Sequence, residues 1–117
     1  MSEVIFHQAV EEWIKHCRNP RVQLSSSVEP VTNCAPYRKI VSMGYEALPL
    51  IRQVYDRDSS DSFLLSILKG YGLVSVVREI VGDDFSIPEE IQGRISAMED
   101  YTKRWLDENM SRYVFTQ

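Results

Sequence analysis

The 117-residue chain is long enough for one domain, which at this size buries roughly two-thirds of its unfolded surface. Hydrophobic residues make up 44% of the chain and charged residues 26%, as in an ordinary soluble globular protein. Seventeen acidic against thirteen basic residues give a net charge of -4. This charge disfavours non-specific binding to nucleic acid or to anionic membranes, and leaves only a local basic patch for such contacts.

Nothing in the sequence predicts a membrane span or an export signal. The apolar runs are too short to cross a bilayer, and the N-terminal stretch MSEVIFHQAVEEW lacks the basic start and apolar core of a signal peptide. Cys17 and Cys34 are too few for a disulfide framework. We therefore expect a cytoplasmic protein with two reduced thiols and no membrane contact.

The first element is an amphipathic helix over about residues 3–17. Ser2 is a suitable N-cap, and Asn19-Pro20 supplies a stop. Apolar residues recur at three- and four-residue spacing and form one stripe, made of Phe6, Ala9, Val10, Trp13, Ile14 and Cys17. This pattern predicts one buried face and one charged, exposed face.

Two residue pairs on this helix raise the question of chemistry. His16 and Cys17 are adjacent, and adjacent helical residues diverge by about 100°, so a packed thiol beside a surface imidazole is favoured over a catalytic pair. His7 and Glu11 share a face at i and i+4, but a solvated surface pair explains two potential ligands as well as a metal site does. We predict no catalytic or metal-binding residue here.

Residues 18–35 form the least regular part of the chain. Pro20, Pro30 and the serine run at 25–27 are typical of a loop or of short turns. The segment is longer than most connections, and long ordered loops are often functional. We favour a strap that covers the open end of the helices, with a functional loop as the alternative.

The stretch over 37–58 predicts two helices joined by a turn. Pro36 suits the first turn of a helix, and Gly44 ends that helix in the left-handed conformation. Pro49 is tolerated only in a first turn, so the next helix should start near Glu46. The inward positions are Tyr37, Ile40 and Val41 in the first helix, and Ala47, Leu48, Ile51, Val54 and Tyr55 in the second.

The apolar run over 62–68 predicts a central, buried helix. Gly70 and Gly72 follow it, and we expect them to break it. The next segment, 73–81, is rich in valine and could be mistaken for a strand. Its apolar residues follow helical spacing rather than alternation: Leu73, Val77, Ile80 and Val81. We therefore predict a second helix there.

After a turn at Gly82-Asp83-Asp84, a last helix is expected from Ser86 to about Asn109. Its opening turns contain Pro88 and two glutamates, which suit the positive end of the helix dipole. Its apolar stripe consists of Ile91, Ile95, Met98, Tyr101 or Thr102, Trp105 and Leu106. The tail over 111–117 either folds back through Tyr113 and Phe115 or frays.

Sequence motifs of common catalytic and cofactor-binding sites are missing. The chain has no CxxC, HExxH, P-loop, GxSxG or glycine-rich dinucleotide turn. Its aspartates are concentrated in turns, where capping is their commonest role. Asp83-Asp84 with Glu89-Glu90 offers oxygen ligands for a divalent cation, but an acidic turn before a helix needs no metal. We predict no catalytic, cofactor-binding or metal-binding residue.

The segment MGYEALPLIRQVYDRDSSDSFLLSIL resembles one HEAT-like helical repeat. The glycine, the alanine two residues before a proline, the aliphatics after it and the Asp-rich turn stand where that pattern has them. Over about residues 37–109 the chain also resembles a group of small uncharacterised bacterial proteins. The matching residues are Met43, Gly44, Ala47, Pro49, Leu50, Ile51, Gly82, Asp83, Pro88, Gly93, Trp105 and Leu106.

The chain departs from that group at two places. Residues 61–63 stand where the group tends to have a tryptophan-rich helix, and Val81 replaces a threonine. The insertion-like stretch KGYGLVSV also disturbs the helix alignment. No activity or catalytic residue comes with the group, so the resemblance implies a helical fold in a bacterial protein and no reaction.

These observations predict an all-α, compact single domain over residues 1–117, with about five to six helices in HEAT-like pairs. Stacked helix pairs expose a broad face that such domains use for recognition. We therefore predict a small cytoplasmic binding or adaptor protein that recognises another protein and needs no cofactor. The oligomeric state and the identity of the partner are left open.

Two alternatives remain. A nucleic-acid binder would need a local basic ridge, and the outward-facing candidates are Arg38, Lys39 and Arg52, with Arg18 and Arg21 as further basic residues. Convergence of these side chains on one face would favour nucleic acid, and a scattered set would favour protein recognition. An enzyme of unknown type would need a deep pocket that gathers His7, His16 or the acidic turns.

Overall fold

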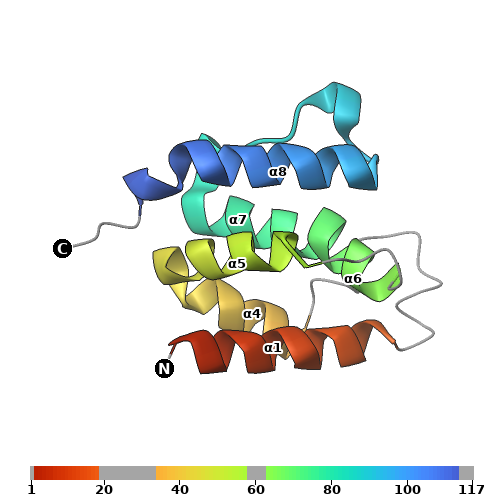
Figure 1. Cartoon of the computed structure of the whole chain (residues 1–117), viewed down its shortest axis with the longest axis vertical. Helices are drawn as coiled ribbons and strands as arrows, with labels where there is room; N and C mark the ends of the chain where they lie inside the picture. The colour runs from red at the N-terminus through yellow and green to blue at the C-terminus, as the bar shows by residue number, and fades with distance from the viewer. Residues whose placement is uncertain (1, 19–33, 58–62, 114–117) are drawn as a thin grey trace.

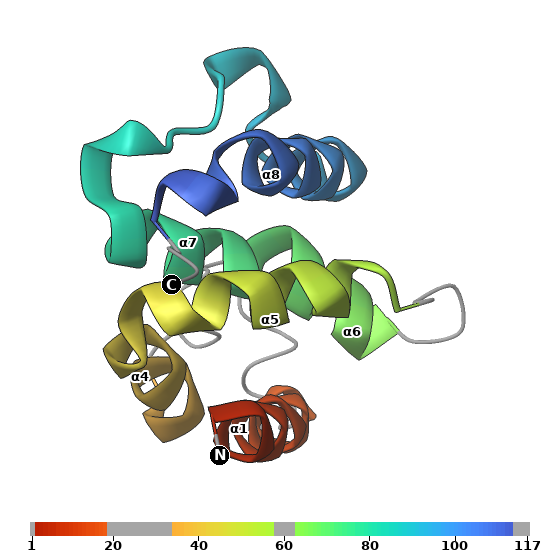
Figure 2. The same ribbon diagram turned by 60° about the vertical axis from the view of Figure 1, so that its left-hand side comes forward.

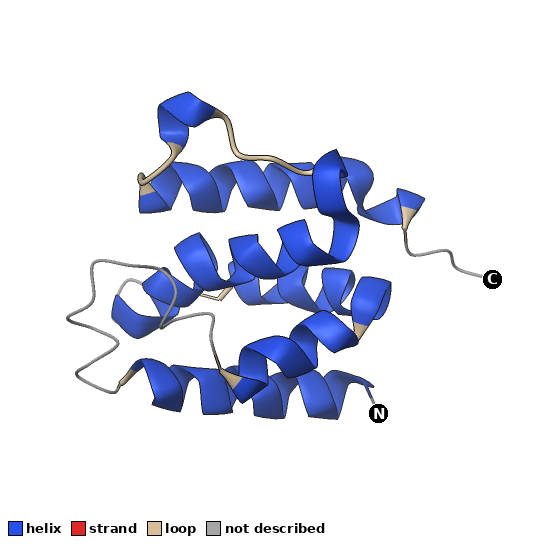
Figure 3. Ribbon diagram, turned by 180° about the vertical axis from the view of Figure 1, so that it is seen from behind, coloured by secondary structure: helices blue, strands red, loops and turns tan. Residues whose placement is uncertain are grey.

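The computed structural model describes residues 2–18, 34–57 and 63–113, and these residues are almost entirely helical. Figure 3 shows helices joined by short loops, with no strand in the described part of the chain. The prediction of an all-α domain with about five to six helices is therefore confirmed. Most of the irregular segment predicted over 18–35 lies outside the described residues, as does Phe115.

The first two described helices follow the predicted apolar stripes. α1 (Ser2–Cys17) begins one residue earlier than expected and ends where predicted. Its stripe is buried except for the half-buried Ile14. α4 (Ala35–Ser42) starts after Cys34 with a proline in its first turn, and buries Tyr37 and Ile40. The two helices pack against each other, with the rings of Trp13 and Tyr37 edge-on at a centroid distance of 5.5 Å.

The predicted turn between α4 and the next helix is confirmed. Gly44 has a φ of 68°, the left-handed value that ends a helix without steric cost. A short 3₁₀ turn, η1 (Gly44–Glu46), leads directly into α5 (Ala47–Tyr55), so Pro49 lies in the first turn of α5. All five predicted inward residues of α5 are buried, and Leu50 joins them.

The predicted break at Gly70 and Gly72 is wrong. α6 (Phe63–Ile67) continues through a π-helical segment, η2 (Leu68–Gly72), into α7 (Leu73–Val81), so helical structure runs from 63 to 81. The amide of Leu73 donates to the carbonyl of Leu68, an i to i−5 bond that accommodates one extra residue in the turn. The hydroxyl of the buried Tyr55 donates to the carbonyl of Lys69 at 2.8 Å and so satisfies a backbone group of η2.

The two glycines provide space for packing rather than a break. A Cβ on Gly70 would lie 2.3 Å from Cγ2 of Ile95, and a Cβ on Gly72 would lie 2.6 Å from Cζ2 of Trp13. Both distances are far below a normal carbon–carbon contact. Glycine is therefore required because α1 and the last helix approach η2 closely.

The last helix begins later than predicted. α8 (Ile95–Asn109) does not extend back to Ser86, because Gln92 is extended with a ψ of 135° and Gly93 has a φ of 85°. Before it lie two short 3₁₀ turns, η3 (Gly82–Asp84) and η4 (Glu89–Ile91), and after it a third, η5 (Met110–Arg112). Between η3 and η4, Phe85 is buried against the ring of Trp105 at a centroid distance of 5.0 Å.

The helices form three layers. Figures 1 and 2 show α1 along one edge and α8 along the opposite edge, with α5 and the α6–α7 run between them. α5 packs on both α1 and α8, η2 packs on α8, and α4 packs on α1 and α7. One apolar core runs through all layers. As a result, the outward sides of α1 and α8 form the two opposite ends of the domain along its longest axis.

Candidate functional site

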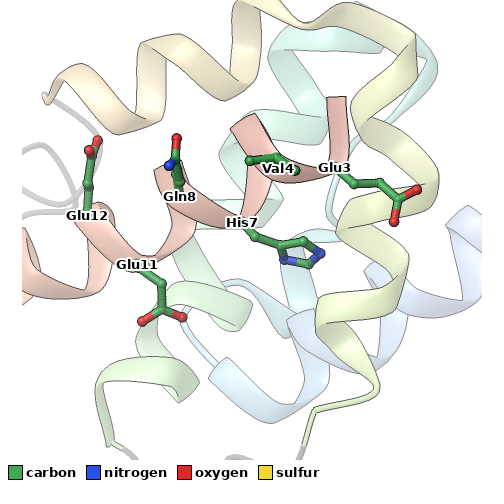
Figure 4. A pocket seen from close by; sticks show the side chains of 6 residues that line it. All are labelled: Glu3, Val4, His7, Gln8, Glu11 and Glu12. Carbon is green, nitrogen blue, oxygen red and sulfur yellow. The ribbon is translucent and has the colours of Figure 1, made fainter. Parts of the chain in front are cut away.

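A shallow depression, largely open to solvent and with a volume of about 700 Å³, runs along the outward side of α1. The described residues that line it form two i, i+4 rows on this helix: Glu3, His7 and Glu11, and Val4, Gln8 and Glu12. Figure 4 shows these six side chains projecting to the two sides of the helix. We call this set the α1 face.

The α1 face combines exposed aliphatic surface with negative charge. Val4 is 58% exposed, and its neighbour Ile5 is 43% exposed. All three glutamates of the face are also exposed. The one ion pair in the described structure that reaches them joins Glu11 to Arg57 across 4.0 Å, at the limit of a salt bridge, and contributes little in solvent. The face therefore retains most of its negative charge.

The two residue pairs singled out on α1 have different surroundings. His7 contacts the ring of Phe6 edge-on at a centroid distance of 5.5 Å and lies beside Glu11 on the α1 face. Cys17 is buried, as predicted, and His16 is half-buried. Burial, followed by the nearby Cys34 thiol, raises the pKa of Cys17 to about 11. Cys17 is thus a neutral, poorly nucleophilic thiol at physiological pH.

The three residues of the predicted basic ridge have different partners. Arg38 and Lys39 are exposed on α4. Arg52, on α5, is held by carboxylates: its Nε and Nη2 donate to Asp107 of α8 at 2.7 and 3.2 Å, and its Nη1 donates to Asp56 at 2.9 Å. Hydrogen bonds from Arg52 lower the pKa of both aspartates, so the carboxylates stay ionised. The charge of Arg52 is therefore offset locally.

A second, smaller cavity lies between α7, the segment before α8, and α8. Its volume is about 280 Å³, and it is lined by Val74, Ser75, Arg78, Ser86, Ile87, Gln92 and Met98. We call it the Arg78 cleft. The sequence does not predict this cleft, because the pattern over residues 86–92 favours the start of a continuous helix. In such a helix these residues would not form a wall of the cleft. No motif in the sequence indicates this site.

The two acidic pairs considered for a cation, Asp83-Asp84 and Glu89-Glu90, face solvent in the described structure. Asp83, Asp84, Glu89 and Glu90 are all exposed, and Asp84 accepts a hydrogen bond from the hydroxyl of Tyr113. Tyr113 also packs on Trp105 and Tyr45, so the start of the tail folds back on the domain. Across residues 2–18, 34–57 and 63–113, no three His, Cys, Asp or Glu side chains gather closely enough to hold a metal ion.

None of the helices in the described part of the chain is both long enough and apolar enough to cross a membrane. Comparisons with protein-family models, with curated proteins and with solved structures found no match for this chain.

Proposed function

We propose that this domain is a small cytoplasmic adaptor that recognises another protein, and that it does so through the α1 face. The observation that supports this is the coexistence of exposed Val4 and Ile5 with three glutamates beside a shallow, open depression on α1. Exposed aliphatic side chains rimmed by polar ones are typical of interaction sites. The opposite side of α1 packs into the core, which fixes the orientation of this face.

The chemistry of the α1 face defines the kind of partner. Val4 and Ile5 can be covered by the apolar side of an amphipathic helix, which is a common way for helical proteins to recognise each other. Glu3 is adjacent to Val4, and Glu11 and Glu12 follow two turns later on the same helix; these carboxylates complement lysine or arginine side chains. The proposed partner segment is therefore a basic amphipathic helix. The HEAT-like resemblance supports the same role, since such domains bind partners along helix faces.

The nucleic-acid alternative loses support from the position of Arg52. To bind a phosphate, the guanidinium of Arg52 would have to break its hydrogen bonds to Asp56 and Asp107. If it kept them, the two carboxylates would lie close to the phosphate and repel it. The net charge of -4 acts in the same direction. Arg38 and Lys39 alone would supply few phosphate contacts.

The test is a charge reversal on the α1 face. The domain and its Glu11→Lys/Glu12→Lys variant are used to capture proteins from lysate of the native host, and the captured protein is then titrated against both by calorimetry. We expect the variant to lose at least about tenfold in affinity, because two attractive charges become repulsive. Both side chains are exposed, so circular dichroism should show an unchanged fold.

The matched control is Glu89→Lys/Glu90→Lys, which makes the same change of charge at two adjacent exposed glutamates outside the α1 face. This control should bind the partner nearly as well as the unmodified domain. An equal loss of affinity in both variants would show that the effect comes from net charge and not from the α1 face. If the Glu11→Lys/Glu12→Lys variant binds the partner as well as the unmodified domain does, the recognition surface does not lie on the α1 face.

A further inference from the structure

The Arg78 cleft has an apolar floor and polar edges. Val74 of α7 and Met98 of α8 are 8% and 6% exposed, and the half-buried Ile87 completes the apolar part. Ser86 and Arg78 are exposed at the edge. This combination of a mainly apolar concavity with a few polar groups is typical of small-ligand sites.

The wall of the cleft is braced. The side-chain amide of Gln92 donates to the carbonyl of Ile87 at 3.2 Å and so closes the segment 87–92 on itself. The 3₁₀ turn η4 lies within the same segment. Two residues before this segment, the buried Phe85 packs against Trp105 and anchors the chain there. The cleft is therefore formed by fixed backbone, which lowers the entropic cost of binding a ligand.

Arg78 differs from Arg52 in having no carboxylate partner among the described residues. Among the ion pairs of the described residues, none involves Arg78, and its guanidinium forms no hydrogen bond there. Ser86 likewise forms no side-chain hydrogen bond in the described structure. Ser75 also borders the cleft and is half-buried. The cleft thus offers the guanidinium of Arg78 and the exposed hydroxyl of Ser86 beside aliphatic surface.

We propose that the Arg78 cleft binds a small aliphatic carboxylate. The planar guanidinium matches a carboxylate in a bidentate pair, and the Ser86 hydroxyl can donate to the same group. The hydrocarbon tail then covers Val74, Ile87 and Met98. A volume of 280 Å³ equals the space of about nine waters, which suits a ligand of a few carbon atoms. A single cation with an apolar floor fits a monoanion with a tail better than it fits a phosphate.

The experiment is a titration of the ¹⁵N-labelled full chain with butyrate and hexanoate, followed by amide chemical shifts. Saturable shifts are expected at residues 74–78, 86–87, 89–92 and 98. Hexanoate should bind more tightly than butyrate by up to about fifteenfold, since each buried methylene contributes at most about fourfold. Arg78→Gln should weaken hexanoate binding about tenfold or more, and Arg78→Lys should weaken it less.

Two controls make the result decisive. Arg104→Gln removes an exposed arginine of α8 that does not line the cleft, and should leave the affinity unchanged. Butyramide has the shape of butyrate without its charge and should not bind measurably. The proposal is overturned if Arg78→Gln binds hexanoate as well as the unmodified chain does, or if butyramide matches butyrate. It is equally overturned if inorganic phosphate binds more tightly than hexanoate, or if no saturable shift occurs at the cleft.

Discussion

The turn at Gly44 and the π-helical segment around Gly72 use the same residue type for opposite reasons. At Gly44 the backbone has a φ of 68°, and a Cβ built there would meet nothing within 4 Å. At Gly72 the backbone is helical with a φ of -64°, and a Cβ would lie 2.6 and 2.8 Å from two ring carbons of Trp13. Gly44 therefore adopts a left-handed backbone conformation in a place with ample space for a side chain. Gly72 has an ordinary helical backbone and no space for a side chain.

This difference determines how each region tolerates change. Strain at Gly44 is local, since it depends on the φ of one residue and on no neighbour. Strain at Gly72 is shared with Trp13, which is fully buried and cannot move without disturbing the core. Gly70 repeats the second case against Ile95 of α8. The π-helical segment therefore couples both outer layers of the domain to the middle one.

The largest effect is expected for Gly72→Ala. Overpacking a rigid core costs about 3 kcal/mol, and alanine returns about 1 kcal/mol through its better helix propensity. The expected net destabilisation is about 2 kcal/mol, measured by urea unfolding monitored by circular dichroism. Unchanged stability would mean that α1 can move away from η2 at little cost.

A double-mutant cycle identifies Trp13 as the cause. Trp13→Phe removes the ring atoms that approach position 72, so in this background Gly72→Ala should cost less than about 1 kcal/mol. Trp13→Phe is destabilising on its own because it leaves a cavity, and the cycle subtracts that cost. An equal cost of Gly72→Ala in both backgrounds would place the clash elsewhere.

A smaller effect is expected for Gly44→Ala. A left-handed residue with a Cβ costs about 1–2 kcal/mol, and alanine recovers about half of this by restricting the unfolded chain. We expect a net loss of about 1 kcal/mol in the same unfolding assay. Gly44→Asn is the matched control and should cost less, since asparagine tolerates the left-handed region. Equal losses for the two variants would contradict the conformational explanation.

These two regions also show what can be predicted from the sequence. The turn at Gly44 is predictable because the glycine is flanked by two apolar stripes and followed by Pro49, all of which are local signals. The buried stripes of α1 and α5 are predictable for the same reason, since period alone fixes them. The role of Gly70 and Gly72 depends on Ile95 and Trp13, which are distant in sequence, so spacing cannot show it.

The candidate sites follow the same division. The outward side of α1 is predictable, because it is the complement of a helical stripe. The Arg78 cleft is not, because it depends on the backbone of residues 86–92 folding over α7 before α8 begins. The pairing of Arg52 with Asp107 joins residues 55 positions apart and also has no local signal.

The smallest effect is expected where the layers are joined by charge rather than by close packing. Arg52 links α5 to α8 through Asp107, and it also holds Asp56. Both carboxylates are exposed, so Arg52→Gln at neutral pH should destabilise the domain by less than Gly44→Ala does. Urea unfolding of the variant and of the unmodified chain measures this difference.

The effect of Arg52→Gln should depend on pH, because Arg52 lowers the pKa of both aspartates in the folded state. A depressed pKa stabilises the fold above the ordinary value near 4, and this stabilisation is lost as pH falls through the folded value. Urea unfolding at about pH 7 and about pH 2.5 should therefore show a larger difference between Arg52→Gln and the unmodified chain at the higher pH. Arg57→Gln is the control, since its pair with Glu11 spans 4.0 Å and should give no difference at either pH. A difference for Arg52→Gln that is undiminished at the lower pH would show that the arginine acts through the packing of its aliphatic stem and not through its two aspartates.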